Sequence, residues 1–317
     1  EIDRMLAGGD FKSEFSAVCE RLKDLPASDV FIHVRAFSDS LFPSEYYPQK
    51  ENAASLGFDP FAFMISALAG AGVRAHAWIN PFRTADGGFL DPADGKVRAR
   101  ILCGIREITE KYDVAGIHMD DYFYPAESGD IDAASYAAYT KNAAFPLNKA
   151  AWRTANINSL VFSAADIIKQ SGKDMLLSIS PCADTEKNLN SSFANVKAWC
   201  DGGAVDLIIP QLYFGFDYPT EKFRFLNLLK EWKELINGGS ARLIIGLAAY
   251  KLGTSSPPDS TEWQTGEDIL ARQVKACYED SAVSGVCFFS FSYLFSREEL
   301  NTAAREKVKN ELNSHLT

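Results

Sequence analysis

The stretch Val114-Ala-Gly-Ile-His-Met-Asp-Asp-Tyr-Phe-Tyr-Pro125 decides how the rest of the sequence is read. Val114 to Met119 has the continuous apolar character of a short buried strand. Asp120 and Asp121 follow at once, then three aromatic residues, and Pro125 ends regular strand pairing because it has no N–H group. A buried strand that ends in two acids and an aromatic run is typical of the mouth of an active site.

Six further apolar segments alternate along the chain with segments of helical periodicity. Strands that are apolar along their length are typical of a parallel sheet covered on both faces. The predicted strands are residues 29–37, 73–80, 114–119, 174–181, 205–213, 242–250 and 285–291. The predicted helices are residues 11–25, 60–70, 96–112, 132–170 with a break near Pro146, 192–200, 220–236, 266–280 and 296–312.

This strand–helix rhythm predicts one α/β domain over residues 1–317, a (β/α)8 TIM barrel. A closed barrel needs eight strands, and the sequence supplies seven. Since the helix over residues 11–25 precedes the first of them, we expect strand one to be missing or truncated at the N-terminus, with Glu1-Ile2-Asp3 as its tail. An open doubly wound sheet is the alternative.

Composition excludes several classes of partner. The 317 residues include 32 Lys plus Arg against 42 Asp plus Glu, a net charge of −10. This balance argues against nucleic acid or an anionic membrane surface. No apolar run reaches the length of a transmembrane helix. The first residues, Glu1 to Leu6, lack the features of a signal peptide, so we expect a leader to be absent or already removed.

The sequence gives no sign of a metal or cofactor site. Its six cysteines form no C-x-x-C pair and are expected to be small buried hydrophobic residues. The four histidines, at positions 33, 76, 118 and 315, show no paired spacing of zinc ligands. The strand ends also carry no phosphate-binding glycine loop, and no cofactor is predicted.

Polar and aromatic residues gather at the predicted strand ends, where a (β/α)8 barrel places its active site. Aromatic rings beside amides and acids suit a sugar, because ring faces stack on apolar sugar faces and hydroxyl groups need polar partners. Asp120 and Asp121 are the predicted catalytic residues. The predicted substrate-binding residues are Arg35, His76, Trp78, Asn80, His118, Tyr122, Tyr124, Gln211, Tyr213 and Lys251.

Each of these assignments has a structural alternative. One of the two aspartates could cap the following loop, Arg35 could form a salt bridge at the barrel mouth, and Trp78 and Tyr213 could be packing residues. His118 could be a structural histidine that points into the barrel with Asp120. Lys251 could form a Schiff base, although its place beyond the strand end favours a surface or sugar-binding role.

Glycoside hydrolysis normally uses two carboxyl groups, one of which protonates the leaving oxygen. Two adjacent acids cannot both ionise freely, so one pKa should rise, as a general acid at neutral pH requires. We therefore expect Asp120 and Asp121 to share this work.

Five segments together resemble the bacterial glycosyl-hydrolase-like family 10 proteins, and the likeness extends from VRAFSDSLFPSEYYP (34–48) to the last strand. The G-I-H-x-D-D-Y-F-Y-P motif is the most specific. The chain departs from the family after LSISP, where Cys182 to Asn188 replaces a Phe-Gly and Trp-Arg-Asn segment and only Asn188 matches. The five segments are HAWINPFR (76–83), YDVAGIHMDDYFYP (112–125), LSISP (177–181), IIPQLYF (208–214) and LAAYKLG (247–253).

The resemblance implies a (β/α)8 glycosidase, exported or attached to the cell envelope, that acts on a bacterial cell-wall polysaccharide such as peptidoglycan. The consecutive aspartates also resemble those of enzymes that cleave N-acetylhexosaminides with substrate assistance. Asp120 would then orient the 2-acetamido group, and Asp121 would act as general acid and base. In the alternative, Asp120 is a covalent nucleophile, with Glu1, Asp184 or Asp217 as acid.

We therefore predict a monomeric glycoside hydrolase that binds an oligo- or polysaccharide. Two other functions remain open on the sequence: a non-catalytic carbohydrate-binding barrel, and a lyase or aldolase that uses Lys251.

Overall fold

The computed structural model describes residues 1–125, 129–254 and 261–315. Its centre is one parallel sheet in which every strand pairs with the next in sequence. This sequential order confirms the barrel-type arrangement and excludes the doubly wound alternative, whose strand order reverses. The strands are β1 (Asp29–Arg35), β2 (Arg74–Ile79), β3 (Gly116–Met119), β4 (Leu176–Ile179), β5 (Leu207–Ile208), β6 (Arg242–Ala248) and β7 (Val283–Phe289).

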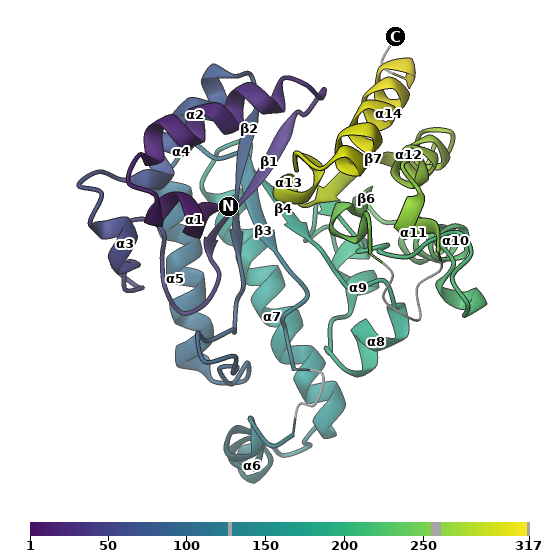
Figure 1. Cartoon of the computed structure of the whole chain (residues 1–317). Coiled ribbons are helices and arrows are strands. Elements are labelled where there is room, and N and C mark those ends of the chain that lie inside the picture. Colours follow the sequence, from purple (N-terminus) through teal and green to yellow (C-terminus); the bar gives the residue numbers. More distant parts are fainter. Residues whose placement is uncertain (126–128, 255–260, 316–317) are drawn as a thin grey trace.

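Helices surround the curled sheet (Figure 1). The α-helices are α1 (Ile2–Ala7), α2 (Phe11–Leu22), α3 (Glu51–Ala54), α4 (Pro60–Gly70), α5 (Gly95–Lys111), α6 (Ala133–Asn142), α7 (Lys149–Gln170), α8 (Thr185–Asn190), α9 (Val196–Asp201), α10 (Phe225–Ile236), α11 (Glu262–Thr265), α12 (Ile269–Tyr278), α13 (Phe291–Leu294) and α14 (Glu299–His315). Two 3-10 turns, η1 (Glu221–Phe223) and η2 (Ala249–Lys251), complete the set.

In the part of the chain that the structure describes, the sheet has seven of the eight strands of a (β/α)8 barrel. Among the described residues, β1 and β7 form no ladder with each other, so the sheet stays open between them. The two ends are nevertheless close, because Arg21 of α2 donates a hydrogen bond to the backbone carbonyl of Phe295 after α13. Arg21 also lies over the Phe291 and Phe295 rings, at 5.1 and 5.4 Å from their centroids.

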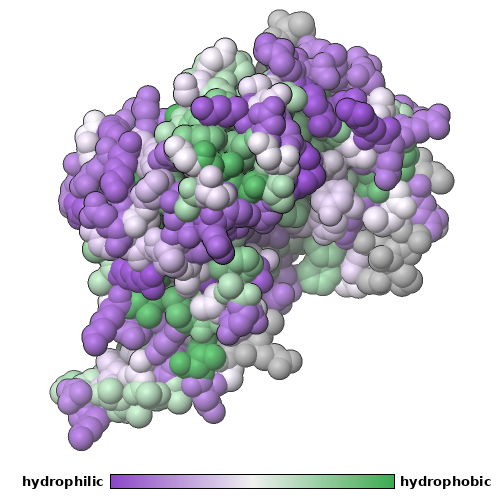
Figure 2. Space-filling view, turned by 60° about the vertical axis from the view of Figure 1, so that its left-hand side comes forward, coloured by the Kyte–Doolittle hydropathy of each residue, from purple (hydrophilic) through white to green (hydrophobic). Residues whose placement is uncertain are grey.

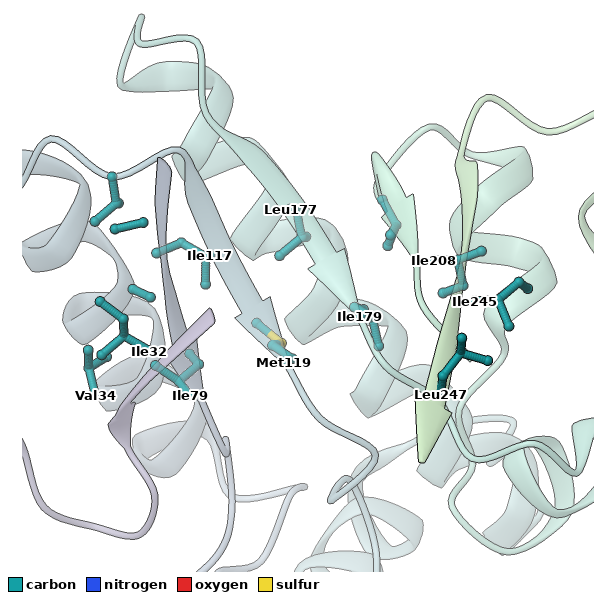
Figure 3. Close-up of a cluster of buried hydrophobic side chains, with 14 of the residues drawn as sticks. Ile32, Val34, Ile79, Ile117, Met119, Leu177, Ile179, Ile208, Ile245 and Leu247 are labelled. Carbon is teal, nitrogen blue, oxygen red and sulfur yellow. The ribbon is translucent and has the colours of Figure 1, made fainter. Parts of the chain in front are cut away.

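The main apolar core lies between the sheet and its helices. Strand β3 is buried along its whole length, because helices cover one face and the barrel interior covers the other. Its Ile117 and Met119 lie in the helix-side layer with Ile32, Ile79 and Ile179 (Figure 3). His118, between them, points into the barrel, since side chains alternate along a strand.

The surface is mixed, as Figure 2 shows for one face, with hydrophilic side chains broken by smaller apolar areas. Helix α6 projects from the lower end of the molecule and contains no buried residue (Figure 1). Its exposure follows from its place in an excursion between β3 and α7 that does not cover the sheet. Among the described residues, no helix combines the length and the apolar character that crossing a membrane requires.

The N-terminal prediction was wrong. Residues 1–3 are not the tail of a strand, because Glu1 precedes α1 and Ile2 begins that helix. Met5 and Leu6 are consecutive and both buried. In a strand, two consecutive side chains point to opposite faces, whereas in this helix both pack beside α2 and α3.

Two strand predictions need correction. The strand expected over residues 205–213 shrinks to Leu207–Ile208, because Pro210 has no N–H to donate to a ladder. Gln211 rejoins the sheet through isolated bridges to Cys182 and Gly246. In β1 the register shifts between His33 and Arg35, so the expected alternation of Phe31, His33 and Arg35 on one face is broken.

The helix predicted over residues 192–200 is α9, and a second helix, α8, precedes it. Asp184 begins α8 by accepting hydrogen bonds from the backbone N–H groups of Glu186 and Lys187. The sequence Asp184-Thr-Glu-Lys carries this N-cap signal, which could have revealed the helix.

Candidate active site

The barrel interior has three layers of side chains from the amino to the carboxyl ends of the strands. The floor contains Asp29 and His76. The middle layer follows one line of register across four strands, His33–Trp78–His118–Ser178. The rim lies two residues further along the strands and holds Asn80, Asp120 and Ser180, joined by Gln211.

His76 belongs to the floor and was wrongly placed with the substrate-binding residues. It is 1% exposed, and its Nε2 lies 2.8 Å from Asp29 Oδ1. Burial by itself would raise the pKa of Asp29, but hydrogen bonds from His76, Ser28 and Arg74 lower it below the ordinary value. His76 therefore closes the end of the barrel opposite the predicted site.

The middle layer supports the rim. The His33 ring stacks on Trp78 at 4.0 Å between centroids, and Trp78 meets His118 edge to face at 5.8 Å. His118 Nδ1 lies 2.9 Å from Ser178 Oγ. Burial lowers the pKa of both His33 and His118 to about 3, so both rings are neutral at neutral pH. His118 is thus a structural histidine one layer below Asp120.

Asp120 and Asp121 lie at the rim, where β3 turns into its loop. Asp120 Oδ1 accepts a hydrogen bond of 2.9 Å from the backbone N–H of Asp121 and another of 2.9 Å from Gln211 Nε2. Gln211 Nε2 also donates to the carbonyl of Ser180 at 3.0 Å. The amide of Gln211 therefore bridges the ends of strands β3 and β4, and it holds the Asp120 carboxyl in one orientation.

The environment of the two acids favours a shared proton. Burial, and then the charge of Asp121, raise the pKa of Asp120 well above its usual range. Burial also raises the pKa of Asp121, although hydrogen bonding and the charge of Lys187 oppose the shift. A carboxyl group that keeps its proton toward neutral pH can act as a general acid.

The loop after the acids is anchored by packing. Phe123 is buried against Trp199, with 5.4 Å between ring centroids. Tyr124 is 3% exposed, packs edge to face on Phe193, and donates its hydroxyl to Asp132 Oδ2 at 3.3 Å. Tyr124 thus anchors the loop and does not face open space, so its assignment to substrate binding was wrong.

Behind Tyr124 lies a buried ion pair. Arg153 donates from Nε and Nη2 to the two carboxylate oxygens of Asp132, at 2.6 and 2.7 Å. The same guanidinium lies over the Tyr124 and Phe193 rings, about 5 Å from each centroid. A bidentate pair fixes geometry as well as charge. The rim loop is therefore tied to α7 through Tyr124.

Tyr122 faces a residue that the site prediction missed. Arg83, at the end of HAWINPFR, lies with its guanidinium carbon 4.3 Å from the Tyr122 ring centroid and 5.3 Å from that of Phe37. Its charge lowers the pKa of Asp120, so it acts on the acid pair electrostatically. Its position four residues after the strand end is the signal that could have identified it.

An aromatic wall stands beside the acids. Tyr213 stacks on Phe289 at 6.1 Å, and Trp78 meets Phe289 edge to face at 6.2 Å. Tyr250 contacts both Tyr213 and Phe289, and Tyr293 continues the wall at 6.1 Å from Tyr250. Phe289 is 39% exposed at the end of β7, and the sequence prediction missed it. Such a wall can stack on a sugar ring.

The other predicted residues divide between the rim and the outside of the barrel. Asn80 lies at the rim, donates to the Ala36 carbonyl at 3.1 Å, and has a buried Oδ1 without a partner among the described residues. Lys251 lies in η2 with its Nζ 5.5 Å from the Phe214 ring and 5.9 Å from the Trp263 ring. Its role stays a prediction.

Arg35 was wrongly placed at the mouth. Because β1 shifts register, Arg35 points outward beneath α5, where a Cβ on Gly104 would lie 3.4 Å from its Nη1. It is 4% exposed, and its guanidinium lies 4.4 Å from the Tyr47 ring centroid. The salt bridge considered as an alternative is also not formed within the described residues.

The acids considered as alternatives have other partners or are exposed. Glu1 pairs with Arg4 at 2.8 Å, and Asp184 caps α8 and pairs with Lys222 at 3.1 Å. Asp217 is exposed in the loop after β5. In the part of the chain that the structure describes, no group of three or more His, Cys, Asp or Glu residues could hold a metal ion.

Known proteins share both the sequence pattern and the fold. The family model described as "Glycosyl hydrolase-like 10" matches residues 81–264. The glycosyl hydrolase YngK of Bacillus subtilis is 26% identical over 89% of this chain, and the chain spans 64% of its length. The glycosyl hydrolase DigH of Escherichia coli K12 is 25% identical over 87% of this chain and 74% of its own length.

A solved structure extends the comparison to the fold. The glycoside hydrolase domain of PgaB from Bordetella bronchiseptica matches with a TM-score of 0.65 and 14% identity, over 93% of this chain and 92% of that one. Fold and rim residues together define a barrel of the glycoside hydrolase class. The chain belongs to the glycosyl hydrolase-like 10 family.

Proposed function

We propose that this chain hydrolyses glycosidic bonds of N-acetylhexosamine residues in a bacterial cell-wall polysaccharide, of which peptidoglycan is the proposed example. The observation that carries the proposal is the pair Asp120 and Asp121, half-buried at the rim with raised pKa values, with Asp120 held by Gln211. The chain spans about two thirds of the length of YngK, so the activity of the whole protein is part of the proposal.

The proposed mechanism is substrate-assisted and retains the anomeric configuration. Asp120, fixed by Gln211, holds the N–H of the 2-acetamido group so that its carbonyl oxygen attacks the anomeric carbon. Asp121 donates a proton to the leaving oxygen in this step. It then takes a proton from the water that opens the cyclic intermediate, so the acid returns to its starting state.

The surrounding residues fit these two steps. Burial raises the pKa of the Tyr213 phenol, so its hydroxyl keeps its proton and can donate a hydrogen bond beside the acids. The wall formed by Trp78, Tyr213 and Phe289 offers ring faces to the sugar. The alternative with Asp120 as covalent nucleophile needs a separate acid, and Glu1 and Asp184 are held by other residues.

Cleavage of chemically matched glycans tests this proposal. N-acetylated and de-N-acetylated forms of the same glycan strand are incubated with the protein, and released reducing ends and anomeric configuration are followed by NMR. We expect cleavage of the acetylated form only, with retained configuration. Equal turnover of the two forms would contradict the substrate-assisted mechanism, and inverted products would do the same.

A polysaccharide of the cell wall is met outside the cytoplasm. We therefore propose that the protein works in the cell envelope or outside the cell, as a monomer. Fractionation of cells with an antibody against the native protein tests the location, and recovery in the cytoplasm alone would contradict it.

A further inference from the structure

We propose that Arg83 is a specificity-determining residue that binds a carboxylate on the glycan, close to the bond that is cleaved. The inference rests on the proposed function of the acid pair and names a feature of its substrate. Arg83 stands at the same rim, and the mechanism above gives its guanidinium no task.

The first observation is that, within the described ranges, the Arg83 guanidinium has no anionic partner. Its Nε is buried without a hydrogen bond, and Arg83 forms no ion pair among the described residues. Arg153 and Arg74, in contrast, pair with Asp132 and Asp29, whereas Arg35 is also unpaired but points away from the rim. A half-buried guanidinium without a counter-charge is costly, and an anion from outside would offset that cost.

The second observation is the orientation that the stacking imposes. The rings of Tyr122 and Phe37 both lie within 5.3 Å of the guanidinium carbon. Stacking on aromatic faces leaves the N–H groups free along the edge of the guanidinium plane. That fork matches the two oxygens of a carboxylate, which it can bind with two parallel hydrogen bonds.

The third observation is that the backbone around Arg83 is already fixed. Arg83 forms an isolated antiparallel bridge with Phe89, and Leu90 donates to the Phe82 carbonyl at 2.8 Å. Between these contacts, Thr84 and Gly88 close a tight turn through a backbone hydrogen bond of 3.0 Å. The guanidinium is therefore presented by a short hairpin and needs little ordering when a ligand binds.

The position of Arg83 near the acid pair indicates that the anion it binds is part of the glycan substrate. The charge of Arg83 reaches Asp120 and lowers its pKa, yet the two form no ion pair. The stacking partner, Tyr122, directly follows the acid pair in the chain. A carboxylate carried by a sugar near the cleaved bond can reach Arg83 while its neighbouring acetamido group meets Asp120. Because the chain carries a net charge of −10, a cation at the rim would offset the repulsion that such a group meets.

The test compares two glycans that differ only in this charge. The probes are peptide-free strands of alternating N-acetylglucosamine and N-acetylmuramic acid, with the lactyl carboxylate either free or converted to a methylamide. We expect kcat/KM of the native protein to be at least about tenfold higher for the free acid, since bidentate charged hydrogen bonds are strong. In Arg83→Gln the ratio should fall to about one, mainly through KM for the acid form.

Two variants sharpen the comparison. Arg83→Lys keeps the charge but not the fork, so it should retain an intermediate ratio. Arg100→Gln is the matched control, because Arg100 also stacks on a tyrosine, at 4.4 Å from Tyr47, but away from the acids. We expect Arg100→Gln to keep the ratio of the native protein. A change of Asp120 acidity in Arg83→Gln would act on both glycans and leave the ratio unaltered.

Failure of this inference can be told apart from failure of the proposed hydrolysis. If the native protein cleaves both strands equally well, Arg83 does not bind a carboxylate of the substrate, and the proposed hydrolysis is unaffected. If it cleaves neither strand, binding of both strands is measured by calorimetry. Tighter binding of the acid, lost in Arg83→Gln, then supports the role of Arg83 alone, and equal binding overturns it.

Discussion

The two ends of the barrel interior hold half-buried aspartates in opposite electrostatic states. At the floor, Asp29 receives hydrogen bonds from His76, Ser28 and Arg74, and its pKa falls below the ordinary value. At the rim, Asp120 lies beside a second acid, and its pKa rises. Burial acts in the same direction on both groups, so the difference comes from their partners.

This contrast separates stability from function. At the floor, hydrogen-bond donors stabilise the ionised form of Asp29, so this aspartate contributes to the stability of the fold. The rim aspartates are left with each other, a neutral amide and a cation that does not pair with them. Two acids held close together destabilise the folded protein. The acid–base chemistry that the pair can perform accounts for such an arrangement.

The largest effect is expected from loss of the rim acids. Asp121→Asn and Asp120→Asn should each lower kcat by about 10³-fold, because a positioned acid or base contributes roughly 10² to 10⁴. Initial rates of glycan cleavage measure this. Asp113 is an exposed aspartate that precedes the same strand at its opposite end, so the Asp113→Asn variant is the control and should keep the turnover of the native protein. Unchanged rates in both rim variants would remove the catalytic assignment.

The second largest effect is expected on stability, from loss of the ion pair between Arg153 and Asp132 behind the rim. Arg153→Met leaves Asp132 as a buried charge without its bidentate partner, and we expect a loss of about 3 kcal/mol in the free energy of unfolding. Urea denaturation at pH 7 measures it. Lys197→Met, which breaks an exposed pair with Asp201, should change stability by less than about 1 kcal/mol. Equal losses in both variants would show that the Arg153–Asp132 pair contributes no more to stability than an exposed ion pair.

At the floor, the contribution of Asp29 to the stability of the protein should be lost in acid. The folded pKa of Asp29 lies below its ordinary value of 3.8, so its contribution is complete above that value and disappears as pH falls through the folded pKa. Asp29→Asn should therefore destabilise the protein by about 1–3 kcal/mol at pH 7. The difference from the native protein should shrink below pH 3.8. A pH-independent difference between pH 3 and 7 would contradict this account.

The smallest effect is expected at the rim, where the contribution of Asp121 to stability should change with pH in the opposite direction to that of Asp29. The folded pKa of Asp121 is raised, so this acid favours the fold only while it is protonated, and that contribution is lost as pH rises above 3.8. Asp121→Asn should therefore stabilise the protein at pH 7 by on the order of 1 kcal/mol. Denaturation curves from pH 3 to 7 should show this gain growing with pH, and destabilisation at pH 7 would break the comparison.

Local patterns predicted much of the fold. The near-continuous apolar runs marked all seven strands, and their alternation with helical segments predicted the parallel order. The rim acids were also recognisable, since Asp120 and Asp121 follow a strand whose neighbours are apolar. These features depend only on the side-chain period and on residues next to each other in the chain.

Side-chain positions that depend on strand register could not be predicted from local sequence patterns. Alternation in β1 placed Arg35 with His33, but a one-residue shift sends it beneath α5. His76 and Asn80 share a face of β2, yet one lies at the floor beside Asp29 and the other at the rim. A strand crosses the whole barrel, so the face of a residue does not give its depth.

The sequence by itself determined the class of fold, the strand order and the acid pair at the end of β3, because these follow from local periodicity and adjacency. Only the tertiary structure decided what surrounds the acids. Gln211 reaches Asp120 from 91 residues away along the chain, and Arg83 approaches from a separate hairpin. The pKa of a carboxyl at the rim depends on such distant partners, so its role is fixed only when these segments have packed around it.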